Sequence, residues 1–254
     1  MNTIYVKLLS RLGNQLFEVA TAYHLAKTYK KRLVLLPNGN SGYEPYDIIL
    51  KCSEGKEIPS NAITIKEPHT QPLMDLSIVK NYDDVIIEGY FQSDKYFTRE
   101  DVEELFPIPT DIKEKYSYLE DYVCISVRRG DYLLLGNKFQ VIPPQWYEKM
   151  YHKYFNGKKV LICGDDIEWC KNNFHIPNQE FLENDCTTST DRLFIMAMCK
   201  NHIISASTFS WWAAYLSKGK VVAPYPWFGK GLSNLNQDDK YVDGWIKEIN
   251  DEML

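Results

Sequence analysis

Residues 122–132 read YVCISVRRGDY. The first six are mostly apolar and include three β-branched residues, which is typical of a strand buried on both faces. The next five bring two arginines, a glycine and an aspartate, which end the strand and begin a turn. In open parallel sheets ligands bind beyond the carboxyl ends of the strands, so this stretch predicts both a central strand and a candidate site.

The alternation of strand and helix continues on both sides of this stretch. Apolar strands are predicted at 4–9, 32–36, 85–89, 159–163, 202–205 and 220–223. Helices are predicted at 16–26, 94–105, 144–155, 165–174, 190–200 and 210–216. Continuous apolar strands alternating with helices predict an α/β protein whose parallel sheets are covered on both faces. Residues 38–84 are weakly periodic, so we expect loops and short helices there.

The chain is long enough for two domains. It has 254 residues, 44% of them hydrophobic, which suits one large domain or two of roughly 100–150 residues each. The best linker is Pro-Ile-Pro at 107–109, because each proline forces the residue before it out of the helical conformation. We predict an N-terminal domain over 1–115 and a C-terminal domain over 116–254, with a C-terminal segment that can pack back on the first.

Charge and cysteine content narrow the class of protein. The net charge of −5 argues against nucleic-acid binding, which needs a surplus of cations. The six cysteines lie at irregular spacings, and two fall within apolar strands, so we expect free thiols in a reducing compartment. No stretch has the about 20 apolar residues that cross a bilayer. We expect a cytoplasmic protein, free or in peripheral contact with the inner face of the membrane.

Two arginines follow the strand at 122–127. Guanidinium groups at a strand end can offer one fork to a phosphate, with Asp131 holding the other in place. The alternative is a surface ion pair between Arg129 and Asp131. The hydroxyls of 207–210, which read STFS, follow another strand and begin a helix, where backbone N–H groups favour anions. Together the two elements describe a cradle for a diphosphate.

Simpler structural roles are open for the other candidates. Ser207 or Thr208 could merely cap the helix at 210–216, with Trp211 and Trp212 in the core. After the strand at 159–163, two aspartates can accept hydrogen bonds from a ribose or a guanine edge. Alternatively, Asp165 caps the next helix and Asp166 favours its dipole.

The turn after the strand at 4–9 and the absence of several known motifs also bear on the predicted function. Gly13, Asn14 and Gln15 offer a tight turn and two neutral amides, so we expect them to line the opposite side of a cleft. The sequence has no GxGxxG, GxxxxGK[ST] or GxSxG, which disfavours dinucleotide oxidoreductases, P-loop NTPases and serine hydrolases. It also has no Asp-x-Asp pair to hold a metal against a diphosphate, so we expect no metal.

Four motifs in this order resemble the α-1,2-fucosyltransferases of glycosyltransferase family 11. They are LGNQLF at 12–17, ISVRRGDY at 125–132, DDIEWC at 165–170 and STFSWWAA at 207–214. The resemblance implies a GT-B-type fold, in which two Rossmann-like domains face each other and the C-terminal one binds GDP-β-L-fucose. It also implies metal-independent, inverting transfer to the 2-hydroxyl of a terminal galactoside, with no cofactor beyond the donor substrate.

The resemblance also implies roles for single residues. Arg128 would bind the β-phosphate and stabilise the leaving GDP, and Asp131 would support the arginines. Asn14 and its neighbours Gly13 and Gln15 would lie on the acceptor side. The predicted donor-binding set is Arg128, Arg129, Asp165, Asp166, Ser207, Thr208, Phe209 and Ser210.

One position departs from the family. Its members usually carry His two residues before the first arginine, and this chain has Ser126, which we count with Arg128 and Asp131 as catalytic. A serine cannot act as a base near neutral pH without a partner. Two alternatives therefore stay open: transfer of another nucleotide-linked sugar, and a catalytically silent protein that binds a glycan or nucleotide.

Overall fold

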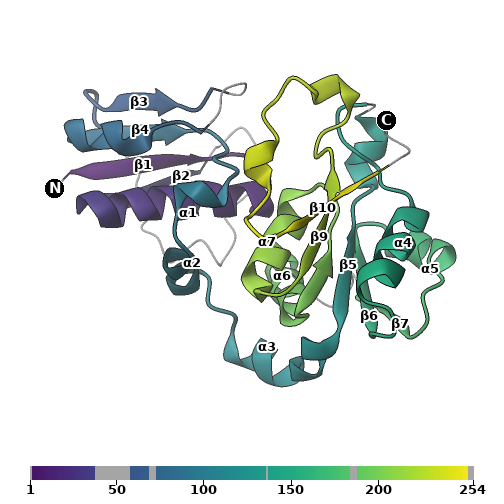
Figure 1. Ribbon diagram of the computed structural model, residues 1–254. Helices are drawn as coiled ribbons and strands as arrows, with labels where there is room; N and C mark the ends of the chain where they lie inside the picture. The colour runs from purple at the N-terminus through teal and green to yellow at the C-terminus, as the bar shows by residue number, and fades with distance from the viewer. Residues whose placement is uncertain (1, 38–57, 69–72, 136, 184–187, 251–254) are drawn as a thin grey trace. The chain divides into compact units, whose positions relative to one another are not determined.

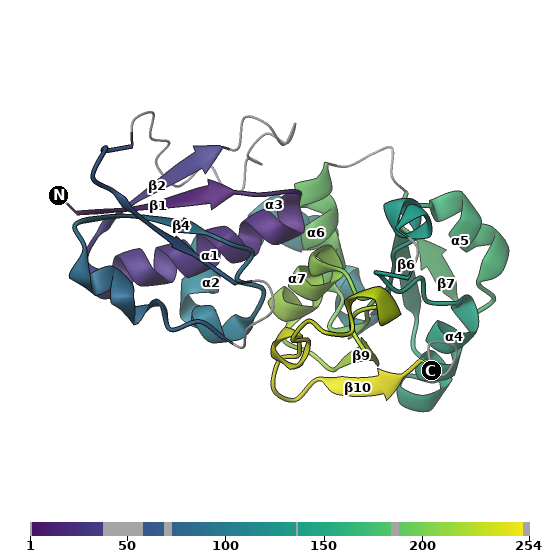
Figure 2. The same cartoon turned by 90° about the horizontal axis from the view of Figure 1, so that it is seen from above.

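The computed structural model describes residues 2–37, 58–68, 73–135, 137–183 and 188–250. The chain divides into two compact units, each built on one parallel sheet (Figures 1 and 2). The first unit is Met1–Pro107 with Asp238–Lys240, and the second is Ile108–Gln237 with Tyr241–Leu254. The division precedes residue 115 because α3 (Thr110–Lys115) packs against α6 (Ser189–Met198) of the second unit.

The first unit has a four-stranded sheet in the order β2-β1-β4-β3, with all neighbours parallel. Its strands are β1 (Thr3–Leu8), β2 (Arg32–Pro37), β3 (Ile63–Lys66) and β4 (Asp84–Glu88). Helix α1 (Leu12–Tyr29) packs against β1 and β2, and α2 (Arg99–Leu105) packs against α1. Strands β1 and β4 are central and almost wholly buried, which explains their continuous apolar sequence.

Helix α1 begins earlier than predicted. Ser10 takes the left-handed conformation, with φ of 61°, and turns the chain sharply after β1. The side-chain amide of Gln15 donates to the carbonyl of Ser10 at 3.0 Å and holds this turn. Gly13, Asn14 and Gln15 therefore lie in the first turn of α1, where we had predicted a separate turn.

Two other predictions for this unit need correction. The helix predicted at 94–105 is divided into the 3-10 turn η2 (Asp94–Tyr96) and α2, because Thr98 and Asp101 form a capping box that starts a new helix. The region 38–84 contains the strand β3 and the 3-10 helix η1 (Leu76–Asn81), although a strand was not predicted there. Residues 38–57 and 69–72 lie outside the described residues.

The second unit has a six-stranded sheet in the order β10-β9-β8-β5-β6-β7, again with all neighbours parallel. Its strands are β5 (Val123–Val127), β6 (Val160–Gly164), β7 (Gln179–Phe181), β8 (Asn201–Ile203), β9 (Val221–Tyr225) and β10 (Ile246–Ile249). The chain runs outward from β5 to β7, returns to β8 and runs outward the other way. This is the order of a doubly wound Rossmann sheet, with its switch point between β5 and β8.

Helices cover both faces of this second sheet, as predicted. Helices α4 (Pro144–Tyr154) and α5 (Ile167–Asn173) lie on one face, and α6 and α7 (Thr208–Ser217) lie on the other (Figures 1 and 2). Alternate residues of β5 pack with α4 and α5 in one apolar cluster, among them Val123 and Ile125. Because side chains alternate along a strand, Ser126 belongs to the opposite face.

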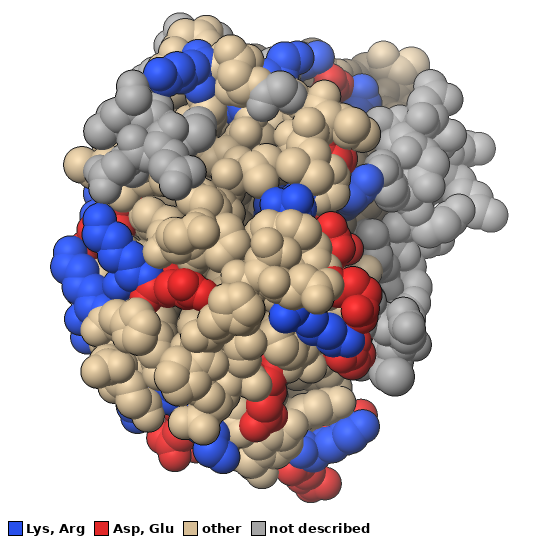
Figure 3. Space-filling view, turned by 90° about the vertical axis from the view of Figure 1, so that its right-hand side faces the viewer, with Lys and Arg blue, Asp and Glu red and all other residues tan. Residues whose placement is uncertain are grey.

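Figure 3 shows lysines and arginines interspersed with aspartates and glutamates on one face, where no broad field of one sign covers the described surface. Cys124, Cys163, Cys170 and Cys199 are free and buried, whereas Cys52 and Cys186 lie outside the described residues. Within the described residues, no helix is both long and apolar enough to cross a membrane.

Candidate active site

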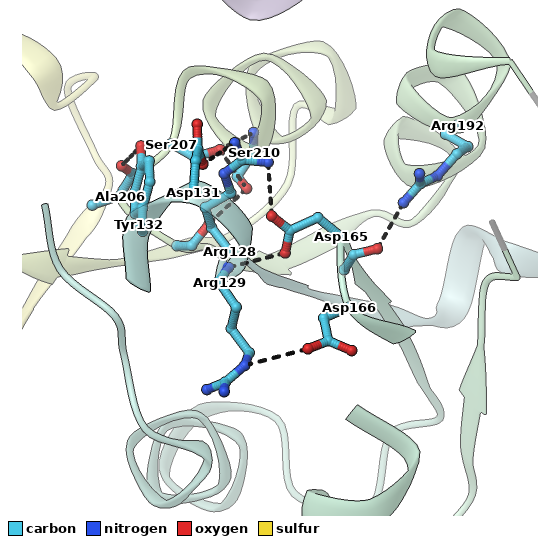
Figure 4. Close-up of polar contacts among 12 residues, drawn as sticks. Arg128, Arg129, Asp131, Tyr132, Asp165, Asp166, Arg192, Ala206, Ser207 and Ser210 are labelled. Carbon is cyan, nitrogen blue, oxygen red and sulfur yellow. Dashed lines mark hydrogen bonds and ion pairs between the residues drawn. The ribbon is translucent and has the colours of Figure 1, made fainter. Parts of the chain in front are cut away.

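Residues from three separate stretches meet at the switch point of the second sheet. Strands β5 and β8 are neighbours at its centre, and the chain leaves them toward opposite edges. Arg128 and Arg129 follow β5, two aspartates follow β6, and the serines of 205–210 follow β8 (Figure 4). The crevice beyond such strand ends is the usual ligand site of a doubly wound fold.

Arg128 is held by two carboxylates and a ring. Its Nη1 lies 2.8 Å from Oδ2 of Asp165, and its Nη2 pairs with Asp131. Its guanidinium carbon lies 5.2 Å from the centroid of the Tyr132 ring. A guanidinium has five N–H donors, so donors remain for an anion after these contacts. Asp131 thus pairs with Arg128, as expected of a carboxylate that holds one of the two arginines in place.

Arg129 is oriented differently. Its guanidinium stacks on the indole of Trp169, with 3.5 Å between the guanidinium carbon and the ring centroid. Its Nε lies 3.9 Å from Oδ2 of Asp166, and its backbone N–H donates to Oδ1 of Asp165 at 2.9 Å. Asp165 thus binds the side chain of Arg128 and the backbone of Arg129. It fixes both arginines relative to the end of β6.

The capping role that was the alternative for Asp165 belongs to its neighbour. Asp166, not Asp165, caps α5: its Oδ1 accepts a hydrogen bond from the backbone N–H of Trp169 at 3.2 Å. The side chain of Asp166 remains 45% exposed. Asp166 can therefore receive a ligand group, while Asp165 is engaged with the arginines.

The hydroxyls at the start of α7 form a buried cluster. Ser207 caps α7 by accepting from the backbone N–H of Ser210 at 3.2 Å. The Oγ of Ser210 lies 2.8 Å from that of Ser205 and 3.2 Å from that of Ser207. Thr208 and Phe209 are half-buried in the first turn of α7. The capping role is thus present, and it leaves the positive end of the helix dipole at the switch point.

Tyr132 links the ends of β5 and β8. Its hydroxyl donates to the carbonyl of Ala206 at 3.1 Å, and its ring stacks on Phe139 with centroids 4.7 Å apart. Burial raises the pKa of Tyr132 to about 12, so the hydroxyl stays protonated and remains a donor. This contact ties the arginine loop to the serine turn.

Ser126 lies within β5, one residue before the end of the strand. It is 2% exposed, and its Oγ has no hydrogen-bond partner among the described residues. It pairs in register with Cys163 of β6. A ligand at the strand ends would therefore have to reach into the sheet to touch this hydroxyl.

Two side chains at the site escaped the sequence analysis. Trp169 supports Arg129, and Arg192 donates through Nη2 to the carbonyl of Gly164 at 2.9 Å, at the end of β6. Both sit in helices, and neither follows a strand directly, so the search beyond strand ends missed them. Gly13, Asn14 and Gln15 belong to the first unit, at the carboxyl end of its β1.

Comparison with known proteins identifies the family. The family model Glycosyl transferase family 11 matches residues 1–249. The chain is 29% identical to the O-antigen biosynthesis glycosyltransferase WbnK of Escherichia coli, over 96% of its own length and 99% of the relative's. It is 30% identical to an alpha-1,2-colitosyltransferase of Escherichia coli, over 63% and 61%. It is 26% identical to galactoside 2-alpha-L-fucosyltransferase SEC1 of Bos taurus, over 84% and 64%.

The fold agrees with this relationship. The NodZ alpha-1,6-fucosyltransferase co-crystallised with GDP superposes with a TM-score of 0.51, over 84% of this chain and 91% of NodZ, at 14% identity. The predicted GT-B-type fold is thereby confirmed. The family match contains all four sequence motifs and confirms that the protein is a glycosyltransferase. The chain belongs to glycosyl transferase family 11.

Proposed function

We propose that the protein transfers L-fucose from GDP-β-L-fucose to the 2-hydroxyl of a terminal galactoside, with inversion at the anomeric carbon. The observation that carries this proposal is the meeting of Arg128, Arg129 and the start of α7 at one switch point. A doubly wound sheet offers this place to a nucleotide, and paired guanidiniums beside a helix N-terminus suit a diphosphate. Relatives that carry α-1,2-fucosyl and α-1,2-colitosyl transferase names support the reaction class.

In this proposal Arg128 meets the charge that develops on the β-phosphate as the bond to fucose breaks. Asp131 and Asp165 both bind its guanidinium, so less side-chain entropy is lost when the donor binds. Ser207, Thr208, Phe209 and Ser210 bring the N-terminus of α7 to the same phosphates. Asp166, with its exposed carboxylate, accepts hydrogen bonds from the nucleoside.

The acceptor hydroxyl must lose its proton during transfer. We propose that the bond to GDP is largely broken before the acceptor attacks, so that a strong base is not required. Such a path places most of the catalytic stabilisation on the leaving group, where the arginines lie. Asn14, with Gly13 and Gln15, is assigned to the acceptor side.

Urea unfolding with and without GDP, followed by transfer assays, tests the proposal. GDP at about 100 times its Kd should raise the free energy of unfolding by about 2.7 kcal/mol, whereas a pure glycan binder should not respond. NMR of the product from GDP-fucose and a β-galactoside should show an α-1,2 linkage. A donor preference for nucleotide-linked colitose would favour the second candidate that the Escherichia coli relative suggests. No nucleotide binding at all would refute both.

We also propose that the reaction needs no metal. The sequence lacks an Asp-x-Asp pair, and two arginines are available to neutralise a diphosphate. Full activity is expected in excess chelator. Activity that disappears with chelator and returns with Mn²⁺ would contradict this assignment of the diphosphate site.

Gly130→Ala should separate folding from nucleotide binding. A Cβ at this position would lie 2.5 Å from Oδ2 of Asp165, the oxygen that binds Arg128. That carboxylate can rotate away, so the free energy of unfolding should change by less than about 1 kcal/mol. Arg128 would lose one of its two carboxylate partners, and the Kd for GDP should rise by about tenfold, the effect of about 1.4 kcal/mol. Urea unfolding and calorimetry measure the two quantities, and an unchanged Kd would mean that this ion pair does not orient Arg128.

Ser126→His restores the residue usual in the family and tests whether the native protein is silent. If the position only tunes the site, turnover should change by about tenfold or less in either direction, below the roughly hundredfold lower end of acid–base catalysis. Because Ser126 is buried, Ser126→Ala serves as the control for packing, and its melting temperature should stay close to that of the wild type. A wild type inert toward GDP-fucose that becomes active as Ser126→His would identify the native chain as a binding protein.

A further inference from the structure

A short segment from late in the chain lies in the first unit. Asp238–Lys240 forms the 3-10 turn η6, which packs against η2, although the residues before and after it belong to the second unit. Asp239 holds the segment through Lys95, with 2.6 Å between Oδ1 and Nζ. The turn brings the amino group of Lys240 into a half-buried position near the carboxyl ends of β1 and β4.

Lys240 begins a chain of hydrogen bonds that ends on Asn14. Its Nζ donates to Oε1 of Gln92 at 2.8 Å, and Nε2 of Gln92 donates to Oδ1 of Asn14 at 2.9 Å. An ammonium group can only donate, so Gln92 must turn its oxygen toward Lys240 and its nitrogen toward Asn14. The oxygen of Asn14 is thereby used, and its Nδ2 is the group that this chain leaves as a donor. The charge on Lys240 thus fixes the direction of both amides.

The backbone around these amides is fixed by other contacts. Strands β1 and β4 are neighbours in the sheet, and Asn14 follows the first as Gln92 follows the second. Glu67 accepts from the backbone N–H groups of Tyr90 and Phe91, both at 2.8 Å, and so anchors the loop that carries Gln92. With the backbone held, the orientation of the two amides is the variable that remains.

We propose that Lys240 is a positioning residue that makes the Asn14 amide present its N–H to an oxygen of the acceptor sugar. The inference rests on the proposed function in one respect, which is that Asn14 lies on the acceptor side. A sugar hydroxyl can donate or accept, but a donor fixed in the protein selects the geometry in which the hydroxyl accepts. Lys240 contributes to acceptor affinity in this way without contacting the sugar.

The charge of Lys240 can be removed by pH alone. Burial lowers the pKa of Lys240 from 10.5 to about 8, although Glu67 and Asp239 nearby favour its charged form. Asp239 is itself paired with Lys95. The ammonium is therefore lost as the pH rises through about 8, and a neutral amine can accept from Gln92, which allows both amides to reverse.

Kinetics of four variants of the full-length enzyme test the proposal. Lys240→Met should raise the KM for a galactoside acceptor by about tenfold, the effect of one hydrogen bond of about 1.4 kcal/mol, and leave the KM for GDP-fucose within about twofold. Lys240→Glu, which accepts where lysine donates, should raise the acceptor KM further, and Lys240→Arg should restore it. Lys27→Met is the control, since Lys27 also forms ion pairs in the first unit, with Asp101 and Glu104. It should change neither KM.

A pH profile separates positioning from a merely structural role. The acceptor KM of the wild type should rise between pH 7 and pH 9 with a midpoint near 8. The profile should be flat in Lys240→Arg, because a guanidinium keeps its proton beyond about pH 12. An acceptor KM unchanged in Lys240→Met and Lys240→Glu, or a pH dependence that survives in Lys240→Arg, would overturn the proposal.

A measurement without substrate distinguishes failure of this inference from failure of the proposed function. In the wild type, the side-chain amide NMR signals of Asn14 and Gln92 should shift together with the midpoint near pH 8. Signals that do not respond would overturn the amide relay even if transfer occurs. If the signals respond but no galactoside accepts fucose, the relay stands and the proposed function fails.

Discussion

Arg128→Lys should lower the turnover of fucose transfer by at least about a hundredfold, or about 2.7 kcal/mol of transition-state stabilisation. Lysine keeps the charge but loses the planar fork. The native guanidinium spans Asp131 and Asp165 at once and still has N–H groups for a phosphate. A single ammonium bound by both carboxylates would be drawn away from the leaving GDP. Initial rates at saturating donor and acceptor measure the loss.

Arg192→Lys is the matched control for this prediction. Arg192 donates a hydrogen bond to the carbonyl of Gly164, which an ammonium can also make, so turnover should fall by less than about tenfold. If Arg128→Lys keeps more than a tenth of the native turnover while binding GDP normally, the leaving group is stabilised elsewhere. An equal loss in both variants would indicate a general effect on the fold of the second unit.

Trp211→Ala should destabilise the protein by about 3–5 kcal/mol, the usual range for an aromatic side chain removed from a core. Trp211 is 1% exposed and stacks on Tyr215, with ring centroids 4.7 Å apart and an interplanar angle of 15°. It also contacts Trp212 and Trp245, at 5.2 Å and 5.5 Å between centroids. These rings support α7 just beyond the serine turn, so the same variant should weaken GDP binding. Urea unfolding measures the stability, with nucleotide absent.

An exposed tyrosine provides the comparison. Tyr118 is 57% exposed, and Tyr118→Ala should lower the free energy of unfolding by less than about 1 kcal/mol. A loss of similar size for Trp211→Ala would show that the aromatic cluster behind α7 contributes little to stability. The urea dependence should keep the same slope in both variants, because the surface exposed on unfolding is nearly unchanged.

Every central strand of the two sheets was predicted, whereas among the edge strands only β2 was. Central strands such as β1, β5 and β6 are buried on both faces, and their continuous apolar runs are easily recognised. The strands not predicted, β3, β7 and β10, are all edge strands. They are three or four residues long and largely half-buried or exposed, so they lack a continuous apolar run. Their pairing depends on the neighbouring strand more than on their own composition.

The candidate site, like the sheets, was predicted only in part from the sequence. Its loops could be predicted because polar residues directly follow apolar strands, as at Arg128 and Asp165. The partner of each aspartate could not be predicted, because Asp131 and Asp166 are each close in sequence to other groups that they could bind. Side-chain orientation decides which partner is reached, and it depends on packing from other elements, such as the Trp169 ring under Arg129. Sequence separation alone carries no such information.

The placement of Asp238–Lys240 has a consequence for exchanging modules among members of the family. The chain leaves the first unit after Pro107, re-enters it at Asp238 and leaves again after Lys240. A hybrid enzyme joined once, near Pro107, would therefore receive this turn from the parent that supplies the second unit. Its Gln92 and its Lys240 would come from different parents and would not be matched to each other. On the proposed role of Asn14 in acceptor binding, a hybrid that is to keep the acceptor preference of one parent must take residues 238–240 from that parent together with the first 107.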